Sequence, residues 1–363
     1  MIIPLKFKGP KRPHMEFRQV ISGPLRIFSI LAAMAMTTVA PLAAQYLTLE
    51  GQTGGFITPT AYVVESEQGH LLSHPAVGYH MINSTAVIGR VQTFSITEGF
   101  ANRAEAGYTR SYHTLGNDTN SSDGAFSQLW NSDGMNIFHG KVVLLSDGQF
   151  HPAVPGVAIG GVVRTGDKFV TSAIDKLYLG GTGAAQTNGD VYVAVTKTWA
   201  KKPVPFLANL GWKATNAAIF GIGGQSTRFG GSFFGGLGFP LPLGHGLVAV
   251  PSAGFTQEPR TAKNLNTLMN LARTELVAQV PAAAALYPTV SAHLPTTLDY
   301  AVRVTQREHP HFSFDIGVGQ VAGNIGSAYA ANPYYPSVGG PLVLSPINLK
   351  ARSVMGMGLS YRY

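Results

Sequence analysis

The chain has 363 residues, no cysteine, 43 glycines and a formal net charge of +8, and only 12% of its residues are charged. The absence of cysteine excludes disulfide frameworks, thiol catalysis and metal sites with cysteine ligands. Soluble proteins usually carry about twice this charged fraction, yet no apolar run after residue 44 reaches the roughly 18 residues of a membrane helix. Together these features favour a closed β-barrel, because in lipid only helices and closed barrels satisfy every backbone group.

The first 44 residues have the layout of a secretory signal peptide. Six basic residues precede an apolar run from Ile27 to Ala40, and small residues lead up to Gln45, which predicts cleavage after Ala44. The competing interpretation, a transmembrane anchor, would need a longer run. Without this leader the formal charge falls to about +3, so the basic balance does not indicate a nucleic-acid partner.

Residues 45–71 do not alternate like a strand. Glycine and proline are frequent between Gly51 and Ala61, and this composition disfavours a central strand. We expect this segment to lie in the lumen of the barrel or under its mouth.

From residue 72 onward, segments of about 10 alternating residues recur between turn-like connections, which is the pattern of a transmembrane barrel. Short and long connections alternate along the chain, and the long ones are 115–134, 167–189, 258–295 and 323–349. The fold class is therefore all-β, an up-and-down antiparallel barrel over residues 72–363 with 12 strands, or 14 as the alternative. The predicted strands are 72–83, 86–97, 103–114, 135–146, 156–166, 190–200, 205–216, 229–240, 246–257, 296–306, 311–322 and 350–363.

The last strand fixes the sidedness. Large apolar residues alternate with small or polar ones from Met355 to Tyr363, and a closing strand that ends on an aromatic residue is typical of bacterial outer-membrane barrels. With this terminus in the periplasm, the short connections are periplasmic and the long loops extracellular. Trp199, Phe206, Tyr361 and Tyr363 are then expected to form an aromatic girdle at the periplasmic rim.

Charged residues of the strands are assigned to the lumen, because a charge facing lipid costs roughly 2–4 kcal/mol at the midplane. Two interpretations stay open: a lining that selects solutes by charge, or internal ion pairs that fill the barrel. Strand 190–200 is ambiguous because both its faces are partly apolar. The candidate lumen-lining residues are Arg90, Arg103, Glu105, His139, Lys141, Lys213, Asp299, Arg303 and Asp315.

One loop contains a helical pattern. Apolar residues at helical spacing between Leu265 and Val280 predict an amphipathic helix over 261–280, ending before Pro281. Two roles stay open for it: packing over the barrel mouth, or binding a partner.

Parts of the chain resemble two known families. Gly189 to Lys197, Leu210 to Gly224 and Val318 to Ile325 resemble a family of bacterial outer-membrane proteins known as a domain of unknown function, over roughly residues 155–325. Against this pattern residues 266–295 look inserted. The stretch from Gly54 to Ala61 is similar to the opening of barrels associated with exopolysaccharide export. Neither resemblance implies a catalytic residue, a ligand or a cofactor.

Catalytic and metal-binding patterns are weak. His311, Ser313 and Asp315 share one strand face, like the His-x-Ser pairing of lipid A deacylases, but the trio lies at the periplasmic end. His70 and His74 are about 13 Å apart on an extended strand and His80 lies further along, so the three cannot share a zinc ion unaided. No nucleotide-binding motif is present in a strand–turn–helix context, and we expect no cofactor.

The sequence thus predicts a non-enzymatic barrel of the bacterial outer membrane, a passive pore or channel for small solutes, in contact with outer-membrane lipid and lipopolysaccharide. A structural or assembly barrel linked to exopolysaccharide export is one alternative, and a lipid-modifying enzyme is another. The sequence does not determine the oligomeric state, and it gives no reason to expect a nucleic-acid partner.

Overall fold

The structure is a computed structural model that describes most of the chain after residue 45. The predicted signal peptide, residues 1–44, and Tyr363 lie outside the described residues. The described ranges are 46–67, 69–83, 90–114, 134–166, 187–200, 205–217, 225–258, 270–290, 296–306, 311–321, 324–331, 344–350 and 353–362.

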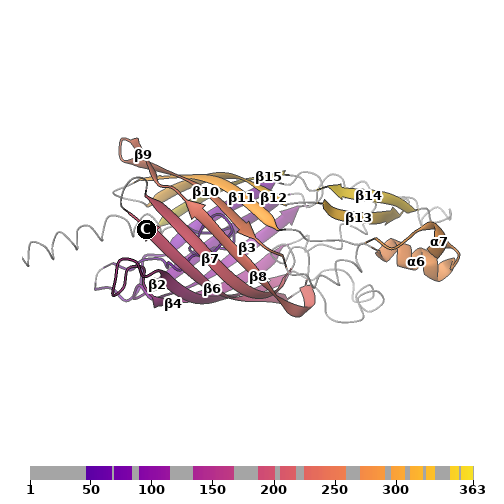
Figure 1. Cartoon of the computed structure of the whole chain (residues 1–363), viewed down its shortest axis with the longest axis horizontal. Helices are drawn as coiled ribbons and strands as arrows, with labels where there is room; N and C mark the ends of the chain where they lie inside the picture. The colour runs from indigo at the N-terminus through magenta and orange to yellow at the C-terminus, as the bar shows by residue number, and fades with distance from the viewer. Residues whose placement is uncertain are drawn as a thin grey trace, which may run out of the picture. The chain divides into compact units, whose positions relative to one another are not determined.

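Twelve antiparallel strands form one closed barrel, and all twelve predicted strands are confirmed (Figure 1). Each strand pairs with its neighbour in the chain, except where β9 and the β13–β14 hairpin intervene. The barrel strands are β1 (Ala76–Asn83), β2 (Arg90–Phe100), β3 (Ala104–Thr114), β4 (Met135–Leu145), β5 (Gly156–Gly166), β6 (Thr187–Trp199), β7 (Phe206–Ala217), β8 (Gln225–Gly238), β10 (Leu247–Thr256), β11 (Thr297–Gln306), β12 (Phe312–Val321) and β15 (Ser353–Arg362).

The barrel closes between its first and last strands. β1 pairs with β15 over eight residues, from Ala76 opposite Arg362 to Asn83 opposite Met355. β10 and β11 also pair directly, although a long connection separates them in the chain. Their pairing extends from Leu247 opposite Gln306 to Thr256 opposite Thr297 without a register shift. A closed sheet has no edge strand, so every strand finds a partner on both sides. The longest connections, which follow β3, β5, β10 and β12, all join strands at the same rim. We call this rim the long-loop rim and the opposite one the short-turn rim.

The outside of the barrel is apolar all the way round. In each strand, exposed large apolar residues alternate with buried ones that face inward, as a pleated strand requires. Trp199 and Phe206 stack at the short-turn rim with ring centroids 4.3 Å apart, where the aromatic girdle is predicted. Every barrel strand contributes to this outer surface, for example with Val77, Phe94, Tyr112, Phe138, Val163, Val191, Trp212, Phe233, Leu247, Tyr300, Phe314 and Leu359.

The structure also resolves the strand that the sequence left ambiguous. In β6 the side chains of Asn188, Asp190 and Tyr192 are buried and face inward, while Val191 and Val195 are exposed on the outside. The inner face is therefore the more polar one, although Tyr192 is part of it.

Five short elements lie in connections predicted as loops or as a helix. β9 (Leu241–Gly244) pairs with the start of β10, so the predicted turn at 241–245 is part of a hairpin. β13 (Asn324–Ala331) and β14 (Leu344–Lys350) form a separate two-stranded sheet within the predicted loop 323–349. The predicted helix over 261–280 is confirmed as α6 (Leu271–Gln279), which ends before Pro281, while residues 261–269 lie outside the described part.

A shorter helix, α7 (Ala283–Leu286), follows α6. Leu276 of α6 packs with Ala283 and with Leu344 of β14 in a small apolar cluster. The amphipathic stripe is thus used for packing within the loop region. Among the helices of the described residues, none has the length and apolarity to span a membrane.

Because the outer surface is apolar, we expect a charged side chain placed on it to destabilise the barrel strongly. Val163 is half-exposed near the middle of β5, and Val163→Arg is expected to lower the free energy of unfolding in lipid vesicles by roughly 2–4 kcal/mol. The control is Phe150→Arg in the exposed β4–β5 turn, which should change it by less than about 0.5 kcal/mol. Equal effects of the two substitutions would show that this surface does not face lipid.

Candidate functional site

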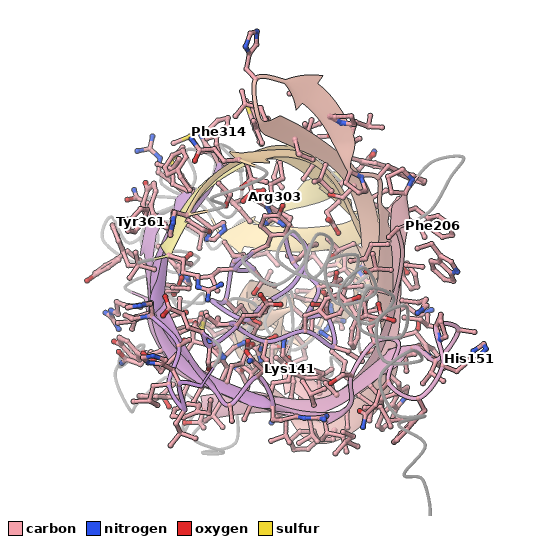
Figure 2. All side chains as sticks on the ribbon, turned by 90° about the vertical axis from the view of Figure 1, so that its left-hand side faces the viewer. Lys141, His151, Phe206, Arg303, Phe314 and Tyr361 are labelled. Atoms are coloured by element: carbon pink, nitrogen blue, oxygen red, sulfur yellow. The ribbon has the colours of Figure 1, made fainter. Side chains whose placement is uncertain are left out.

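The lumen is occupied by residues 46–64, which we call the plug. This segment runs inside the ring of strands, with Lys141 and Arg303 on opposite sides of it (Figure 2). Most of its residues are buried, and its own backbone hydrogen bonds fold it into a compact loop, among them Gly54 N to Tyr46 O at 2.7 Å and Leu49 N to Phe56 O at 2.9 Å. Of the two predicted positions for residues 45–71, the lumen is therefore confirmed for the plug.

A buried ion pair on the wall holds the middle of the plug. Glu105 of β3 and Lys141 of β4 are cross-strand partners, and their charged atoms are 3.0 Å apart. Glu105 accepts hydrogen bonds from the backbone N–H groups of Thr53 and Val64, at 3.0 and 3.1 Å. Lys141 donates to the carbonyl oxygen of Thr53 at 3.0 Å. The pair thus provides acceptors for the backbone N–H groups of Thr53 and Val64 and a donor for the carbonyl group of Thr53.

A second ion cluster holds the tip of the plug. Arg164 of β5 donates two parallel hydrogen bonds to Glu50, from Nε to Oε1 at 2.5 Å and from Nη2 to Oε2 at 2.7 Å. The same guanidinium donates to Asp190 of β6 at 2.7 Å. Bidentate arginine–carboxylate contacts are among the strongest charge-assisted hydrogen bonds in proteins. The tip is therefore fixed to the wall by charge as well as by shape.

Further contacts fasten the plug near the short-turn rim. The Tyr62 phenol donates to Asp147 at 2.7 Å, and Asp147 also pairs with Lys197 at 2.6 Å. Burial and the nearby Asp147 carboxylate both raise the pKa of Tyr62, so the phenol keeps its proton and stays a donor. Asn209 of β7 donates to the carbonyl oxygen of Pro59 at 2.9 Å.

A third wall ion pair lies on the opposite side of the plug. Arg303 of β11 and Asp315 of β12 are cross-strand partners in contact. The Arg303 guanidinium lies 3.9 Å from the centre of the Tyr46 ring, a cation–π arrangement. Arg303 also donates weakly to the carbonyl oxygen of Gly54, at 3.4 Å.

The tip of the plug turns at Gly51, where φ is +84°. A Cβ atom there would collide with Thr109 Oγ1 and would lie 2.8 Å from Ser95 Cβ. Thr97 and Thr109 donate to the carbonyl oxygens of Gly51 and Glu50 at 2.6 and 2.8 Å. Glycine is thus required here both by the left-handed backbone and by the close approach to β2 and β3.

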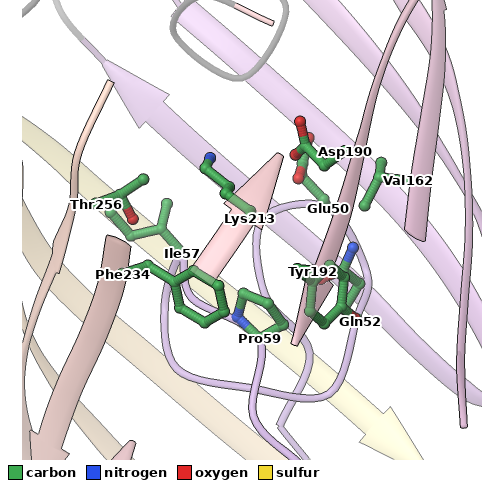
Figure 3. A pocket seen from close by; sticks show the side chains of 10 residues that line it. All are labelled: Glu50, Gln52, Ile57, Pro59, Val162, Asp190, Tyr192, Lys213, Phe234 and Thr256. Carbon is green, nitrogen blue, oxygen red and sulfur yellow. The ribbon is translucent and has the colours of Figure 1, made fainter. Parts of the chain in front are cut away.

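A cavity remains beside the tip of the plug. It is small, because the centre of a water molecule can occupy only about 20 Å³ of it. Glu50, Ile57 and Pro59 of the plug line it together with Lys213 and Phe234 of the wall (Figure 3). The other lining residues are Gln52, Val162, Asp190, Tyr192 and Thr256.

Seven of the nine predicted lumen residues face inward. Lys213 is half-buried, and the others are buried. Four of these seven form the ion pairs Glu105–Lys141 and Arg303–Asp315, so part of the candidate lining consists of internal pairs. The seven are Glu105, His139, Lys141, Lys213, Asp299, Arg303 and Asp315.

The predicted lumen positions of Arg90 and Arg103 are wrong. Arg90 lies on the outer face of β2, because the outward positions of Phe94 and Ile96 fix the alternation of that strand. It is the first residue of the strand, at the long-loop rim, where a charge need not enter the hydrocarbon. Arg103 is exposed in the turn before β3 and donates to Gln149 at 3.4 Å.

Three residues that hold the tip of the plug, Glu50, Arg164 and Asp190, are not among the predicted lumen residues. Arg164 could have been found, since it alternates with the apolar Ile159 and Val163 in a strand that carries no other charge. Asp190 was in the ambiguous strand. Glu50 has no local signal, because its role depends on the fold of the plug.

The histidine patterns do not form sites in the described structure. The ring of His311 contacts the carbonyl oxygen of Arg362 at 3.0 Å, while Asp315 is engaged by Arg303. His80 is buried in the lumen, whereas His74 is exposed and lies 3.4 Å from Glu67. Within the described ranges, no three metal-binding side chains come together.

The Glu105–Lys141 pair gives a stability prediction. Lys141→Met leaves the Glu105 carboxylate buried without its cation, so we expect a loss of roughly 3–5 kcal/mol in the free energy of unfolding. Adding Glu105→Gln removes the buried charge and should recover part of that loss. Urea unfolding in lipid vesicles measures both, and a double variant no more stable than the single one would contradict this role.

Gly51 gives a second prediction with a matched control. Gly51→Ala and Gly69→Ala both place a side chain at positive φ, which costs roughly 1–2 kcal/mol. Only at Gly51 does the new methyl group meet the wall, since nothing lies within 4 Å of a Cβ at Gly69. We expect Gly51→Ala to speed hydrogen exchange in the plug at least tenfold and Gly69→Ala to leave it unchanged. Equal exchange in the two variants would mean that the wall does not hold the plug tip.

The chain was compared with known proteins. No curated protein sequence matches it. Among similar solved structures are the KdgM porin, with 8% identity over 79% of this chain and 99% of that chain and a TM-score of 0.39, and LpxR from Salmonella typhimurium, with 8% identity over 79% and 100% and a TM-score of 0.39. A third is OmpT, an outer membrane protein of Vibrio cholerae, with 7% identity over 80% and 97% and a TM-score of 0.26.

The family model DUF3034, described as a protein of unknown function, matches residues 43–232. The match begins just before the plug and ends within β8, so of the predicted span 155–325 it includes residues 155–232. The chain, a closed twelve-stranded antiparallel β-barrel, belongs to the DUF3034 family.

Proposed function

We propose that this protein is a channel of the bacterial outer membrane that is closed by the plug and passes small polar solutes when the plug moves. The observation that carries the proposal is that the wall pairs its own charges. Lys141 with Glu105, Arg164 with Asp190 and Arg303 with Asp315 are all pairs within the strands. The plug can therefore leave its place without stranding a charge on the wall.

The outward surface supports a place in a membrane. Exposed apolar side chains ring the barrel, and the Trp199–Phe206 stack at the short-turn rim suits the level of lipid head groups. Short turns face the periplasm in outer-membrane barrels and longer loops face outward. On this orientation the Glu50 tip of the plug points toward the outside of the cell, and Tyr62 lies toward the periplasm.

The way in which the plug is held suits a reversible closure. It carries one charged anchor, Glu50, and is otherwise held by hydrogen bonds from wall side chains and backbone. Each such bond contributes about 0.5–1.5 kcal/mol net, and bonds to charged groups about 1.5–3. When the plug moves, water replaces these contacts and solvates Glu50. An apolar plug could not exchange its contacts for water in this way, so it would keep the barrel closed.

The experiment is conductance in planar bilayers. We expect the whole protein to give small or rare currents, and a variant that lacks residues 46–61 to give steady currents at least tenfold larger. Gly51→Ala should lie between the two, and Gly69→Ala should match the unmodified protein. Heat-modifiable migration and circular dichroism establish that each variant is folded.

One result would overturn the proposal. A folded barrel without residues 46–61 that inserts into the bilayer and carries no current has no usable lumen. A structural or assembly role, with polysaccharide export as one case, would then become the better interpretation, and crosslinking in native membranes would be expected to identify a stable partner.

A further inference from the structure

The connection between β8 and β10 leaves the barrel wall at the short-turn rim. Figure 1 and Figure 2 both show β9 outside the ring of strands, at the top of each view. β9 pairs with the start of β10 and, among the described residues, with no other strand. One edge of β9 is therefore free. We call residues 239–247 the rim hairpin.

The rim hairpin is both exposed and apolar. All four residues of β9 are exposed, and the side chain of Leu243 is exposed to 57%. No Asp, Glu, Lys or Arg occurs from residue 229 to residue 257. Each of the other short connections between barrel strands carries a charge, at Arg103, Asp147, Lys201 and Arg307. A turn that faces only water has no need of this uncharged, leucine-rich composition.

The apolar outer face of β8 continues into the rim hairpin. Leu237, Phe239 and Leu241 lie at every second position and are all exposed, so the alternation of the strand carries the outer surface of the wall into β9. The Phe239 ring lies next to Phe206, with centroids 6.4 Å apart, and Phe206 stacks on Trp199. The rim hairpin thus begins at the aromatic girdle, which marks the level of the lipid head groups in outer-membrane barrels.

The free edge of β9 is unsuited to pairing with another protein strand. Phe239 directs its N–H group to the carbonyl oxygen of Pro251 on β10, at 2.9 Å, so the residues on either side of it along the strand direct their backbone groups to the other edge. The residues at that edge are Pro240 and Pro242, which have no N–H group to donate. The rim hairpin is also far shorter than the roughly 20–30 residues that each partner contributes to a stable protein interface. Lipid is therefore the better candidate for its apolar surface.

We propose that the rim hairpin is a phospholipid-binding element that lies at the boundary between the head groups and the acyl chains of the leaflet on the short-turn side. This inference rests on the membrane placement in the proposed function and adds to it a specific contact with lipid. Leu241, Leu243 and Leu247 enter the acyl-chain boundary, as the apolar side chains of interfacial elements do. The carbonyl groups of the free edge stay hydrated at this depth, whereas in the hydrocarbon core they would have no partner.

Site-directed spin labelling tests this placement, because the chain has no cysteine of its own. In phosphatidylcholine vesicles, a nitroxide on Leu243→Cys is compared with one on Leu237→Cys of the outer wall and one on Arg103→Cys in the exposed turn before β3. The measurement is the ratio of the collision rate with oxygen, which concentrates in lipid, to that with a water-soluble nickel chelate. We expect this ratio at Leu243 to be at least about fivefold higher than at Arg103.

Three results would contradict the inference or its basis. A ratio at Leu243 equal to that at Arg103 would place the rim hairpin in water and overturn the inference. Low collision rates with both reagents at Leu243 would mean that protein covers the hairpin, and rates that rise on dilution with unlabelled protein would identify a second copy as the occupant. In both cases a lipid-exposed label at Leu237 leaves the membrane placement intact. A label at Leu237 that is exposed to water would instead mean that the proposed membrane channel itself fails.

A charge on the rim hairpin tests whether its leucines hold it in lipid. With the label on Leu247→Cys, we expect Leu243→Glu to lower the oxygen-to-nickel ratio at least about threefold, because a carboxylate favours water over the acyl-chain boundary. Leu243→Met keeps the side chain apolar and should leave the ratio unchanged. A label on Leu237→Cys should report the same ratio in all three backgrounds, which shows that the barrel remains folded and inserted. An unchanged ratio at Leu247 in Leu243→Glu would overturn the lipid contact of the hairpin.

Discussion

The structure depends on how charges are held inside a closed barrel. A sheet without edges has an outside that faces lipid and an inside too narrow to leave charges fully hydrated, so each inward charge needs a partner nearby. Here the partner is in most cases on the neighbouring strand: Glu105 with Lys141 and Arg303 with Asp315 are directly opposite each other in the ladder. Arg164 reaches Asp190 on the next strand in the same way. These three pairs are therefore complete before the plug is considered.

The plug forms hydrogen bonds with groups of the wall ion pairs that the pairs do not use between themselves. Carboxylates and cations that already neutralise each other still have lone pairs and N–H groups to spare, and the plug backbone supplies the complementary groups at Thr53 and Val64. Only at Glu50 does the plug add a charge of its own. In the proposed channel this division would let the plug move, because Glu50 alone depends on the other part for its counter-charge and would be solvated by water.

The inner wall is not uniform around the barrel. The inner faces of β8 and β10 carry small and apolar residues such as Gly236, Phe234, Val250, Ser252 and Gly254, while β2 to β6 present threonines, histidines and ion pairs. Asp299 is buried, and no basic side chain among the described residues forms an ion pair with it, an arrangement that costs stability.

The sequence by itself determined the barrel. Alternation along each strand and alternation of short and long connections are local properties, so the twelve strands, their inner and outer faces and the end of α6 before Pro281 could all be predicted. The predicted inward orientation is wrong for Arg90 and Arg103. They lie at a strand end and in a turn, where the alternation of side chains is a weak guide. Only the tertiary structure decided that residues 46–64 fill the lumen, that β6 turns Asp190 and Tyr192 inward, and which charges pair. Those outcomes depend on contacts between different segments, from neighbouring strands such as Arg303 with Asp315 to distant ones such as Glu50 with Arg164, and the periodicity of a single segment carries no information about them.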